Sequence, residues 1–167
     1  MTAHEEAPMK FTDILTSSRI VHRLKASNRQ EVLRELVEKG FLAKEAEAGF
    51  DPEDNERILR TLEAREALGS TGIKDGLAIP HGKLEGLPHL VACMGISEAG
   101  IEFGALDDKK SHIFIVLLAP EAAGGLHLKA LARISRLFSD SSFHRRLLEC
   151  GDQSALYDEV ATEDARY

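Results

Sequence analysis

The chain has 167 residues, a mass of 18.4 kDa, 43% hydrophobic and 29% charged residues, which is typical of one globular domain and excludes a fibre, a coiled coil or a disordered chain. Its formal net charge of −7 argues against a nucleic-acid-binding protein, because phosphate backbones are bound by clustered lysine and arginine side chains. We expect residues 1–9 to be a disordered tail and residues 10–167 to form a single domain.

The sequence predicts neither membrane insertion nor secretion. Its most apolar run, residues 113–119, is much shorter than the roughly 20 residues of a membrane-spanning helix. The N-terminus lacks the basic flank and apolar core of a signal peptide. The cysteines, Cys93 and Cys150, match no metal-ligand spacing, and reduced thiols are the simplest interpretation. We therefore expect a cytoplasmic protein.

The first third of the chain contains two helix signatures. Ser27 and Gln30 have the spacing of a capping box, and Gly40 is suited to a left-handed C-cap at the end of that helix. Asp51 and Pro52 predict the start of a second helix, since an acidic cap often precedes a proline in the first turn. Gly69 is expected to end this second helix.

Four apolar segments predict strands, at residues 20–24, 77–79, 90–96 and 111–119. The first would be an edge strand around His22. The last two are apolar on both alternating faces, which is typical of strands buried on both sides of a sheet. Because helical patterns alternate with these strands, we expect an α/β fold, a mixed β-sheet flanked on both faces by helices.

Three more helices are expected after the last strand. The first follows Gly124 and Gly125 and would bury these side chains: Leu128, Leu131, Ala132, Ile134 and Phe138. The second begins at Ser141 or Ser142. In the last helix, Leu156 and Val160 would face inward.

Several common chemical motifs are missing from the sequence. It contains no G-x-x-x-x-G-K-[ST] phosphate-binding loop, no H-E-x-x-H or C-x-x-C metal motif, and no G-x-S-x-G nucleophile elbow. The usual kinase, metallohydrolase and serine hydrolase interpretations therefore have no support. We expect neither a metal ion nor a cofactor.

Among the seven histidines, His81 has the most distinctive surroundings. It follows a predicted strand, Pro80 stiffens the peptide that aims the imidazole, and Gly82 permits a close approach by another segment. A strand-end histidine in a rigid turn is suited to act as an exposed nucleophile or base. The same residues are also compatible with an imidazole that only caps its turn.

The histidines other than His81 and His127 have simpler interpretations. We expect His112 to be a hydrogen-bonded structural residue at the start of a buried strand, and His89 to lie at a strand entry. His22 and His144 are interpreted as surface residues, and His4 lies in the tail.

Two segments carry a family resemblance. They are Arg65-Glu-Ala-Leu-Gly-Ser-Thr-Gly-Ile-Lys-Asp-Gly-Leu-Ala-Ile-Pro-His-Gly-Lys83 and Gly125-Leu-His-Leu-Lys-Ala-Leu-Ala-Arg-Ile-Ser-Arg136. The chain resembles the enzyme IIA domain of the bacterial phosphoenolpyruvate-dependent sugar phosphotransferase system, fructose/mannitol type, which includes the nitrogen-regulatory enzyme IIA. The resemblance extends from about Phe11 to the C-terminal helix, and Ala-Ile-Pro-His-Gly-Lys is its most specific part. It implies the enzyme IIA fold.

The resemblance implies that His81 is the phosphorylated residue of a phosphotransferase component. It would accept a phosphoryl group from the phosphohistidine of the carrier protein HPr, or of a nitrogen-type paralogue, and pass it on. Transfer between two imidazoles of similar basicity is nearly isoergic, so it depends on positioning and charge stabilisation more than on a metal.

The resemblance also implies a role for His127 in stabilising the phosphoryl group or the transition state. Arg65, Ser70, Thr71 and Lys83 would support the site. Without the resemblance each has a simpler interpretation: His127 as a polar residue at a helix start, Arg65 and Lys83 as solvated surface charges, and Ser70 and Thr71 as hydroxyls that satisfy a turn.

Three functions remain open within this resemblance. We favour a stand-alone regulator of the nitrogen-regulatory type, whose phosphorylation state controls target proteins, because the layout of the first forty residues resembles that type. The alternative is a sugar-specific enzyme IIA that donates to the enzyme IIB of a permease. A third interpretation is a non-catalytic sensory module, which would have no need of both His81 and His127.

Overall fold

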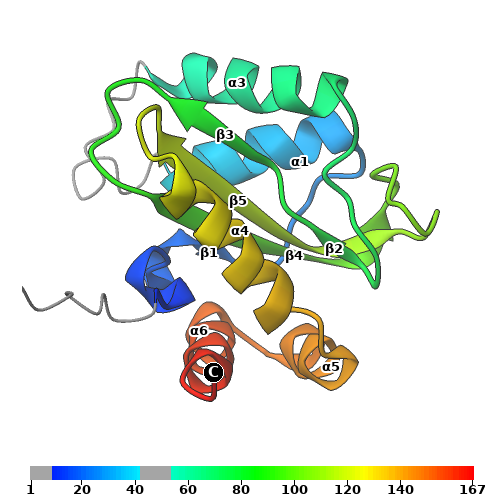
Figure 1. Cartoon of the computed structure of the whole chain (residues 1–167). Coiled ribbons are helices and arrows are strands. Elements are labelled where there is room, and N and C mark those ends of the chain that lie inside the picture. Colours follow the sequence, from blue (N-terminus) through cyan, green and yellow to red (C-terminus); the bar gives the residue numbers. More distant parts are fainter. Residues whose placement is uncertain (1–8, 42–53) are drawn as a thin grey trace, which may run out of the picture.

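A mixed five-stranded β-sheet lies at the centre of the protein in the computed structural model, which describes residues 9–41 and 54–167 (Figure 1). The strands are β1 (Ile20–Val21), β2 (Leu77–Ala78), β3 (His81–Leu84), β4 (Val91–Ile101) and β5 (Ser111–Pro120). Their order is β1-β4-β5-β2, and β3 also pairs with β5. Only β4 and β5 pair in antiparallel fashion, while the other pairings are parallel. The edge strand predicted at residues 20–24 is present as β1, but it ends at Val21, so that His22 lies just beyond it.

The strands β2 and β3 lie one after the other along the same edge of β5. Leu77 is opposite Ile113 and His81 is opposite Leu117, so the register is continuous across the two strands. Between them, the backbone N–H of Leu117 donates to the carbonyl of Pro80 at 2.9 Å. Residues 79–80 therefore interrupt the strand without moving the chain away from β5, and His81 resumes the pairing in the same register.

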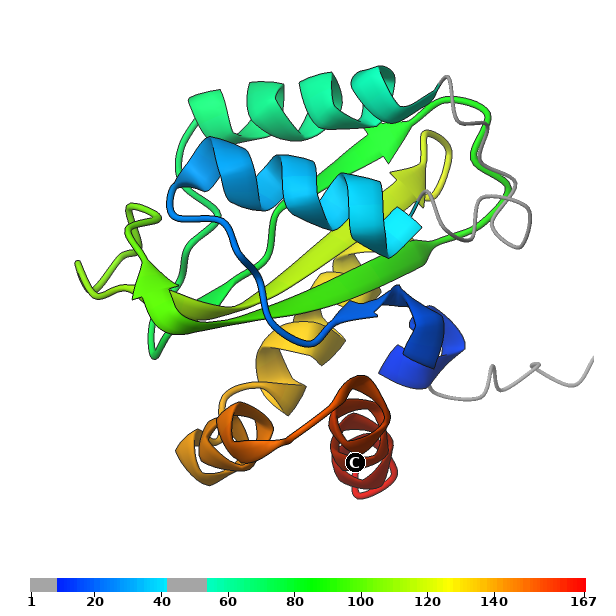
Figure 2. The ribbon, with the colours of Figure 1, turned by 180° about the vertical axis from the view of Figure 1, so that it is seen from behind.

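Helices cover both faces of the sheet (Figures 1 and 2). One face is covered by α1 (Arg29–Leu36), the π-helical turn η3 (Val37–Phe41) and α3 (Asn55–Ala67). The other is covered by α4 (Gly125–Leu137), α5 (Ser141–Glu149) and α6 (Gln153–Asp164), together with the short 3-10 helices η1 (Phe11–Asp13) and η2 (Ser17–Arg19) near the N-terminus. The predicted fold class, a mixed sheet between two helical layers, is confirmed.

The side chains of β5 explain why the sheet needs two helical layers. Ile115 and Leu117 belong to the hydrophobic cluster shared with α4, α5 and α6, whereas Val116 and Leu118 belong to the cluster shared with α1 and α3. Successive residues of a strand point to opposite faces, so an uninterrupted apolar run is stable only when both faces are covered.

Two details of the first helix differ from the sequence prediction. The N-cap of α1 is Asn28, whose side chain accepts the N–H of Glu31 at 2.9 Å, and the Glu31 carboxylate in turn accepts the N–H and hydroxyl of Ser27. The predicted box of Ser27 and Gln30 is therefore shifted by one residue, because a carboxylate is the stronger acceptor for these donors. Gly40 does not form a left-handed cap, since it lies inside η3, where a Cβ atom would be 2.7 Å from Cβ of Cys93.

The helix α4 is rotated relative to its predicted orientation. Its buried side chains are those of His127, Ala130, Ile134 and Leu137, which repeat at helical spacing. Ile134 and Phe138 are buried as predicted, and Leu131 is half-buried. Leu128 and Ala132 were expected inside and are exposed, because His127 rather than Leu128 turns toward the sheet.

Some predictions lie outside the described residues. These are the disordered state of residues 1–8 and the helix start at Asp51 and Pro52. The helix predicted there is described from Asn55 onward as α3, and it ends before Gly69 as expected. Across residues 9–41 and 54–167, no helix is long and apolar enough to cross a membrane.

Candidate active site

His81 is the first residue of β3 and follows the two residues that separate β3 from β2. It therefore begins a strand, whereas the sequence suggested that it ends one. Its Nδ1 lies 2.7 Å from the carbonyl oxygen of Ile79. Because a carbonyl oxygen can only accept, Nδ1 must carry the proton, and in the neutral ring the lone pair is on Nε2. The nitrogen of His81 that keeps a free lone pair is therefore Nε2.

His127 faces His81 across the site. The centroids of the two rings are 5.5 Å apart and the ring planes are nearly perpendicular, at 87°. The His127 side chain is buried, and among the described residues its Nδ1 has no hydrogen-bond partner. A buried polar atom without a partner is costly, so this nitrogen is suited to bind a group that arrives from outside the chain.

The start of α4 adds a second feature favourable to an anion. The N-cap residue Gly124 has φ +52° and ψ −118°, a conformation suited to glycine, and no side chain caps the helix. His127 thus lies in the first turn, where backbone N–H groups have no acceptor within the helix and the helix dipole is positive.

Electrostatics keep the His81 ring neutral. Burial is the largest influence and lowers its pKa, and the positive charge of Arg65 lowers the pKa further. The hydrogen bond to the Ile79 carbonyl and the negative charge of Glu66 oppose this shift without reversing it. At neutral pH the Nε2 lone pair is therefore available.

The pKa of His127 is also lowered, first by burial, then by repulsion from His81 when that ring is protonated, and then by the charge of Lys83. Lys83 is exposed on β3, two residues beyond His81, so it contributes through its charge rather than by packing. Both imidazoles of the pair are consequently neutral before any phosphate is present.

The loop before β2 places the remaining predicted residues. The Arg65 guanidinium donates to the carbonyl of Gly69 at 2.8 Å, which holds the end of α3 against the loop. The hydroxyl of Ser70 donates to the carbonyl of Phe103 and accepts the N–H of Gly72 at 2.9 Å. These contacts order the loop, and they show Ser70 bonded to the backbone rather than directed at the imidazole pair.

Thr71 is hydrogen-bonded to Glu66, a residue that the sequence did not single out. Its hydroxyl donates to one carboxylate oxygen of Glu66, and its backbone N–H lies 3.2 Å from the other. Glu66 is buried, with 5% of its surface exposed. A signal was present in the sequence, because Glu66 lies four residues after Leu62 and seven after Leu59, on the apolar face of α3. A carboxylate on such a face requires a specific partner.

Three other histidines hydrogen-bond to backbone carbonyls. His112 bonds through Nδ1 to the carbonyl of Ser97 at 2.9 Å, which confirms its structural role. His144 was expected at the surface but is buried, with Nε2 bonded to the carbonyl of Phe138, because its ring closes the turn between α4 and α5. His22 is half-buried and bonds to the carbonyl of Cys150 at 2.8 Å.

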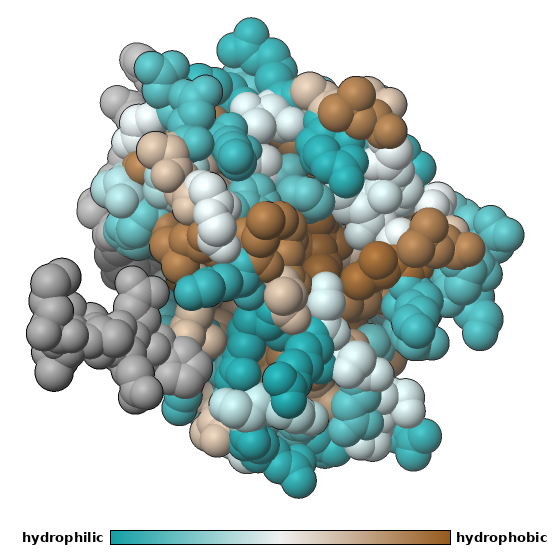
Figure 3. All heavy atoms as spheres, viewed as in Figure 1, coloured by the Kyte–Doolittle hydropathy of each residue, from teal (hydrophilic) through white to brown (hydrophobic). Residues whose placement is uncertain are grey.

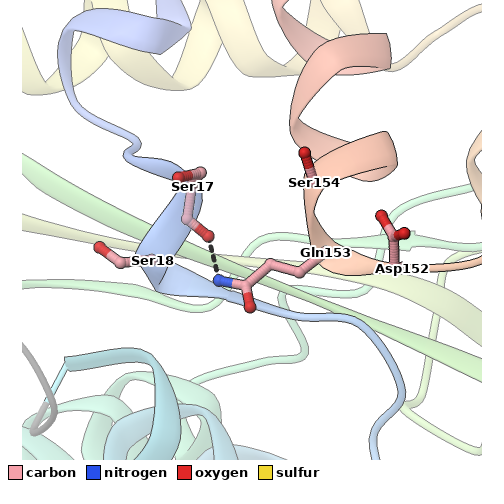
Figure 4. A pocket seen from close by; sticks show the side chains of 5 residues that line it. All are labelled: Ser17, Ser18, Asp152, Gln153 and Ser154. Carbon is pink, nitrogen blue, oxygen red and sulfur yellow. Dashed lines mark hydrogen bonds between the residues drawn. The ribbon is translucent and has the colours of Figure 1, made fainter.

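A pocket of about 560 Å³ lies between η2 and the start of α6 and includes none of the site residues (Figure 4). It is lined by Ser17, Ser18, Asp152, Gln153 and Ser154. Figure 4 shows the Gln153 amide directed at the carbonyl of Ser17, to which it donates a hydrogen bond. The Asp152 carboxylate caps α6 by accepting the N–H of Ala155. These hydrogen bonds connect η2 to α6 and cap α6, which is a structural role. The histidine pair therefore remains the candidate active site.

Comparison with known proteins identifies the family. Residues 13–162 match the family described as phosphoenolpyruvate-dependent sugar phosphotransferase system, EIIA 2. The chain is 37% identical over 157 residues to the nitrogen regulatory protein of Bradyrhizobium diazoefficiens, an alignment that covers 94% of this chain and 98% of that protein. It is also 31% identical over 156 residues to the fructose-specific EIIABC component of Bacillus subtilis, covering 93% of this chain and 24% of that protein.

The structure agrees with these relationships. It is similar to the crystal structure of nitrogen regulatory protein IIA-Ntr from Neisseria meningitidis, with a TM-score of 0.77, 28% sequence identity, and coverage of 89% of this chain and 97% of that chain. The chain therefore belongs to the enzyme IIA type-2 family of the phosphoenolpyruvate-dependent sugar phosphotransferase system, and within that family it is of the nitrogen-regulatory type.

Proposed function

We propose that this nitrogen-type phosphoryl carrier accepts its phosphoryl group on Nε2 of His81. The observation that carries the proposal is the hydrogen bond from Nδ1 of His81 to the Ile79 carbonyl, opposite the ring of His127. The bond leaves Nε2 as the nucleophile of a neutral imidazole, and the pKa of His81 is lowered chiefly by burial, which favours that neutral form.

In the transfer step, the Nε2 lone pair of His81 attacks the phosphorus atom of a phosphohistidine on the donor protein. The N–P bond of the donor breaks as the new N–P bond forms, and the electron pair of the broken bond returns to the donor ring. The proton on Nδ1 stays on His81, held by Ile79. Only the two imidazoles and the phosphoryl group change their covalent bonds, so the rest of the protein acts by positioning and electrostatics.

In this proposal His127 stabilises the charge of the transferred group. Its unpartnered Nδ1 would donate to the phosphoryl oxygens, as would the first-turn N–H groups of α4 other than that of Leu126, which donates to the carbonyl of Ala123. The charges of Arg65 and Lys83, which already influence the two imidazoles, would add to the positive potential around the phosphate. Ser70 and Thr71 would act indirectly by ordering the loop.

The surface around the pair supports a protein as donor. Hydrophobic side chains form a band across the middle of one face, over the first half of α4 and on toward the loop between β4 and β5 (Figure 3). Leu126 and Leu128, on either side of His127, are 44% and 69% exposed, and Leu106 in the loop, beside the other end of α4, is 80% exposed. Exposed apolar groups around a reactive residue are typical of a docking surface. We infer that HPr or a nitrogen-type paralogue binds here.

A regulatory role in the cytoplasm is the form of this function that we favour. The relative with 37% identity over nearly its whole length is a nitrogen regulatory protein, and the free thiols of Cys93 and Cys150 are compatible with a reducing compartment. In this role the phosphorylated and unphosphorylated forms would bind target proteins differently.

A second function is favoured by the 31% identity to a fructose-specific EIIABC component. In that case phosphorylated His81 would donate to an enzyme IIB. The two functions differ in the fate of the phosphoryl group, because rapid loss to a purified fructose-type enzyme IIB would favour the sugar-transport role and retention would favour the regulator.

The test is phosphoryl uptake by the purified chain. With enzyme I, HPr and phosphoenolpyruvate, intact-mass measurement should show one added phosphoryl group on the wild-type protein and none on His81→Ala. His127→Ala should still be phosphorylated, at a rate lower by roughly 10²–10³-fold, since one electrostatic donor is lost. His127→Gln keeps a hydrogen-bond donor, so its phosphorylation rate should lie between those of the wild-type protein and His127→Ala.

Failure of the wild-type chain to gain mass from either HPr type would overturn the proposal and leave a non-catalytic sensory module. Phosphate that persists in His81→Ala would place the acceptor elsewhere. An unchanged rate in His127→Ala would restrict that residue to a structural role and leave the α4 N–H groups and the nearby cations to stabilise the charge.

A further inference from the structure

The carboxylate of Glu66 occupies an unusual position for a charged group. It is 5% exposed, and within the described part of the chain it takes part in no ion pair with lysine or arginine. Removing a carboxylate from water is costly unless hydrogen bonds compensate. Its compensation comes from a single residue, Thr71, through the hydroxyl and the backbone N–H.

A chain of hydrogen bonds continues from Thr71 to the reactive imidazole. The carbonyl of Thr71 accepts the N–H of Ile79 at 3.1 Å, and the carbonyl of Ile79 accepts the Nδ1 proton of His81 at 2.7 Å. Gly72 pairs with Ala78 in an isolated bridge beside this chain, so the loop and the segment before His81 run antiparallel. The orientation of the Ile79 peptide thus depends on where Glu66 holds Thr71.

We propose that Glu66 is a positioning residue for phosphoryl transfer: through Thr71 and Ile79 it fixes the orientation and the Nδ1–H tautomer of His81, so that Nε2 faces the incoming phosphoryl group. This inference rests on the proposed role of His81 as the acceptor. It goes beyond that role because Glu66 touches neither the imidazole nor the phosphate, and acts through two peptide groups.

The charge of Glu66 also affects the basicity of His81, and this effect is separate from positioning. It raises the pKa of His81, whereas burial and Arg65 lower it. The charged groups around these residues are Arg65 on the same helix, Lys83 on β3, and Arg29 and Glu63, which line a pocket of about 190 Å³ together with Glu66. Neutralising Glu66 should therefore make His81 less basic without changing the distance between the rings.

The experiment measures the His81 tautomer and the transfer rate in parallel. In wild-type protein, above the His81 pKa, ¹⁵N chemical shifts of the imidazole should report the Nδ1–H form. In Glu66→Ala a mixture of the two tautomers is expected, and the rate at saturating phospho-HPr should fall by roughly 10²-fold with KM unchanged, since misorientation affects the transition state and not docking.

Four further variants separate positioning from general destabilisation. Glu63→Ala removes a carboxylate one turn earlier on the same helix, where the side chain is exposed, and should leave tautomer and rate unchanged. Thr71→Ser keeps the hydroxyl and should behave like the wild type, whereas Thr71→Val loses it and should resemble Glu66→Ala. Glu66→Gln keeps the shape of the side chain and should show a lower His81 pKa in an NMR titration.

A folded Glu66→Ala with the wild-type tautomer and rate would overturn the proposal. Should that variant fail to fold, a wild-type tautomer and rate in Thr71→Val, which lacks the hydroxyl bonded to Glu66, would do the same. The tautomer measurement needs no phosphate, so it decides the role of Glu66 even if the wild-type chain takes no phosphate from HPr and the proposed function is wrong.

Discussion

The chemistry of the site depends on which nitrogen of His81 holds its proton. The Ile79 carbonyl accepts from Nδ1, and burial is the main reason why the pKa of the ring is low. His127, at 5.5 Å between ring centroids, is also neutral and buried. The site thus combines an imidazole whose Nε2 lone pair is available at neutral pH with an unpartnered nitrogen of His127 beside it, and neither property can be read from the sequence alone.

The lowered pKa of His81 predicts how the site responds to pH. Protonation of Nε2 removes the lone pair, so phosphoryl acceptance should fall as the pH drops through the His81 pKa. That midpoint should lie below the ordinary histidine value of 6.5, and Arg65→Gln should raise it, because the Arg65 charge lowers the pKa. A ¹H–¹³C NMR titration of the His81 ring measures the midpoint directly.

The lowered pKa of His81 also makes the stability of the folded state depend on pH. The unfolded chain binds the His81 proton at a higher pH than the folded chain, so the folded state loses stability as the pH falls from 6.5 toward the folded pKa. A titration midpoint at or above 6.5 in the folded protein would contradict this account of the site.

At the scale of elements, the position of β3 depends on close contact with α3. An ideal Cβ atom on Gly82 would lie 2.7 Å from Cγ2 of Thr61. The Thr61 hydroxyl donates to the carbonyl of Arg57 at 2.8 Å, which holds the methyl group toward the strand. The glycine after His81 is therefore needed for a helix side chain to approach the strand.

This contact predicts the effect of a small substitution. Gly82→Ala should destabilise the protein by about 1–3 kcal/mol, the usual effect of overpacking, and Thr61→Ala should recover part of the loss in the double variant. Gly151→Ala is the control, because no atom lies within 4 Å of its ideal Cβ, and it should change stability by about 0.5 kcal/mol or less. Denaturant unfolding measures each value; additive effects of the Gly82 and Thr61 changes would disprove the contact.

The sequence predicted the positions of those helices and strands that are determined by hydrophobic patterns and helix caps. The strands β4 and β5 and the helices α5 and α6 lie where their apolar residues indicated. The rotation of α4 could not be predicted, because Leu128 is apolar and His127 is polar, yet His127 is buried against the ring of His81 and Leu128 is exposed. The place of His81 at the start of β3 likewise depends on pairing with β5, a contact distant in sequence.

At the scale of the whole molecule, one buried ion pair connects the N-terminal and C-terminal segments to the layer that carries His127. The Arg133 guanidinium of α4 lies 2.6 Å from the Asp164 carboxylate of α6, whose second oxygen accepts the backbone N–H of Thr12 at 2.9 Å. Burial alone would raise the pKa of Asp164, but the bonds from Thr12 and Arg133 keep the pKa below its ordinary value. The helical layer under α4 is thereby held as one unit.

The site contains residues of α3 and α4, which cover opposite faces of the sheet, and His81 of β3 between them. Contacts between elements so distant in the sequence limit what the sequence could predict of the site. The family resemblance identified His81 and His127 as site residues, and the structure brings their rings together from β3 and α4. Glu66 could not be assigned, because its connection to His81 runs through two backbone peptides that fold back on each other. A buried carboxylate on an apolar helix face was the only sign of it.

The central claim is that Nε2 of His81 carries the phosphoryl group, and ³¹P NMR of the phosphorylated chain tests it most directly. After transfer from phospho-HPr, the account predicts one resonance at the chemical shift of Nε2-phosphohistidine, which is lost in His81→Ala. A resonance of Nδ1-phosphohistidine would contradict it, because Nδ1 is bonded to Ile79. So would an Nε2 resonance that persists in His81→Ala and disappears in His127→Ala.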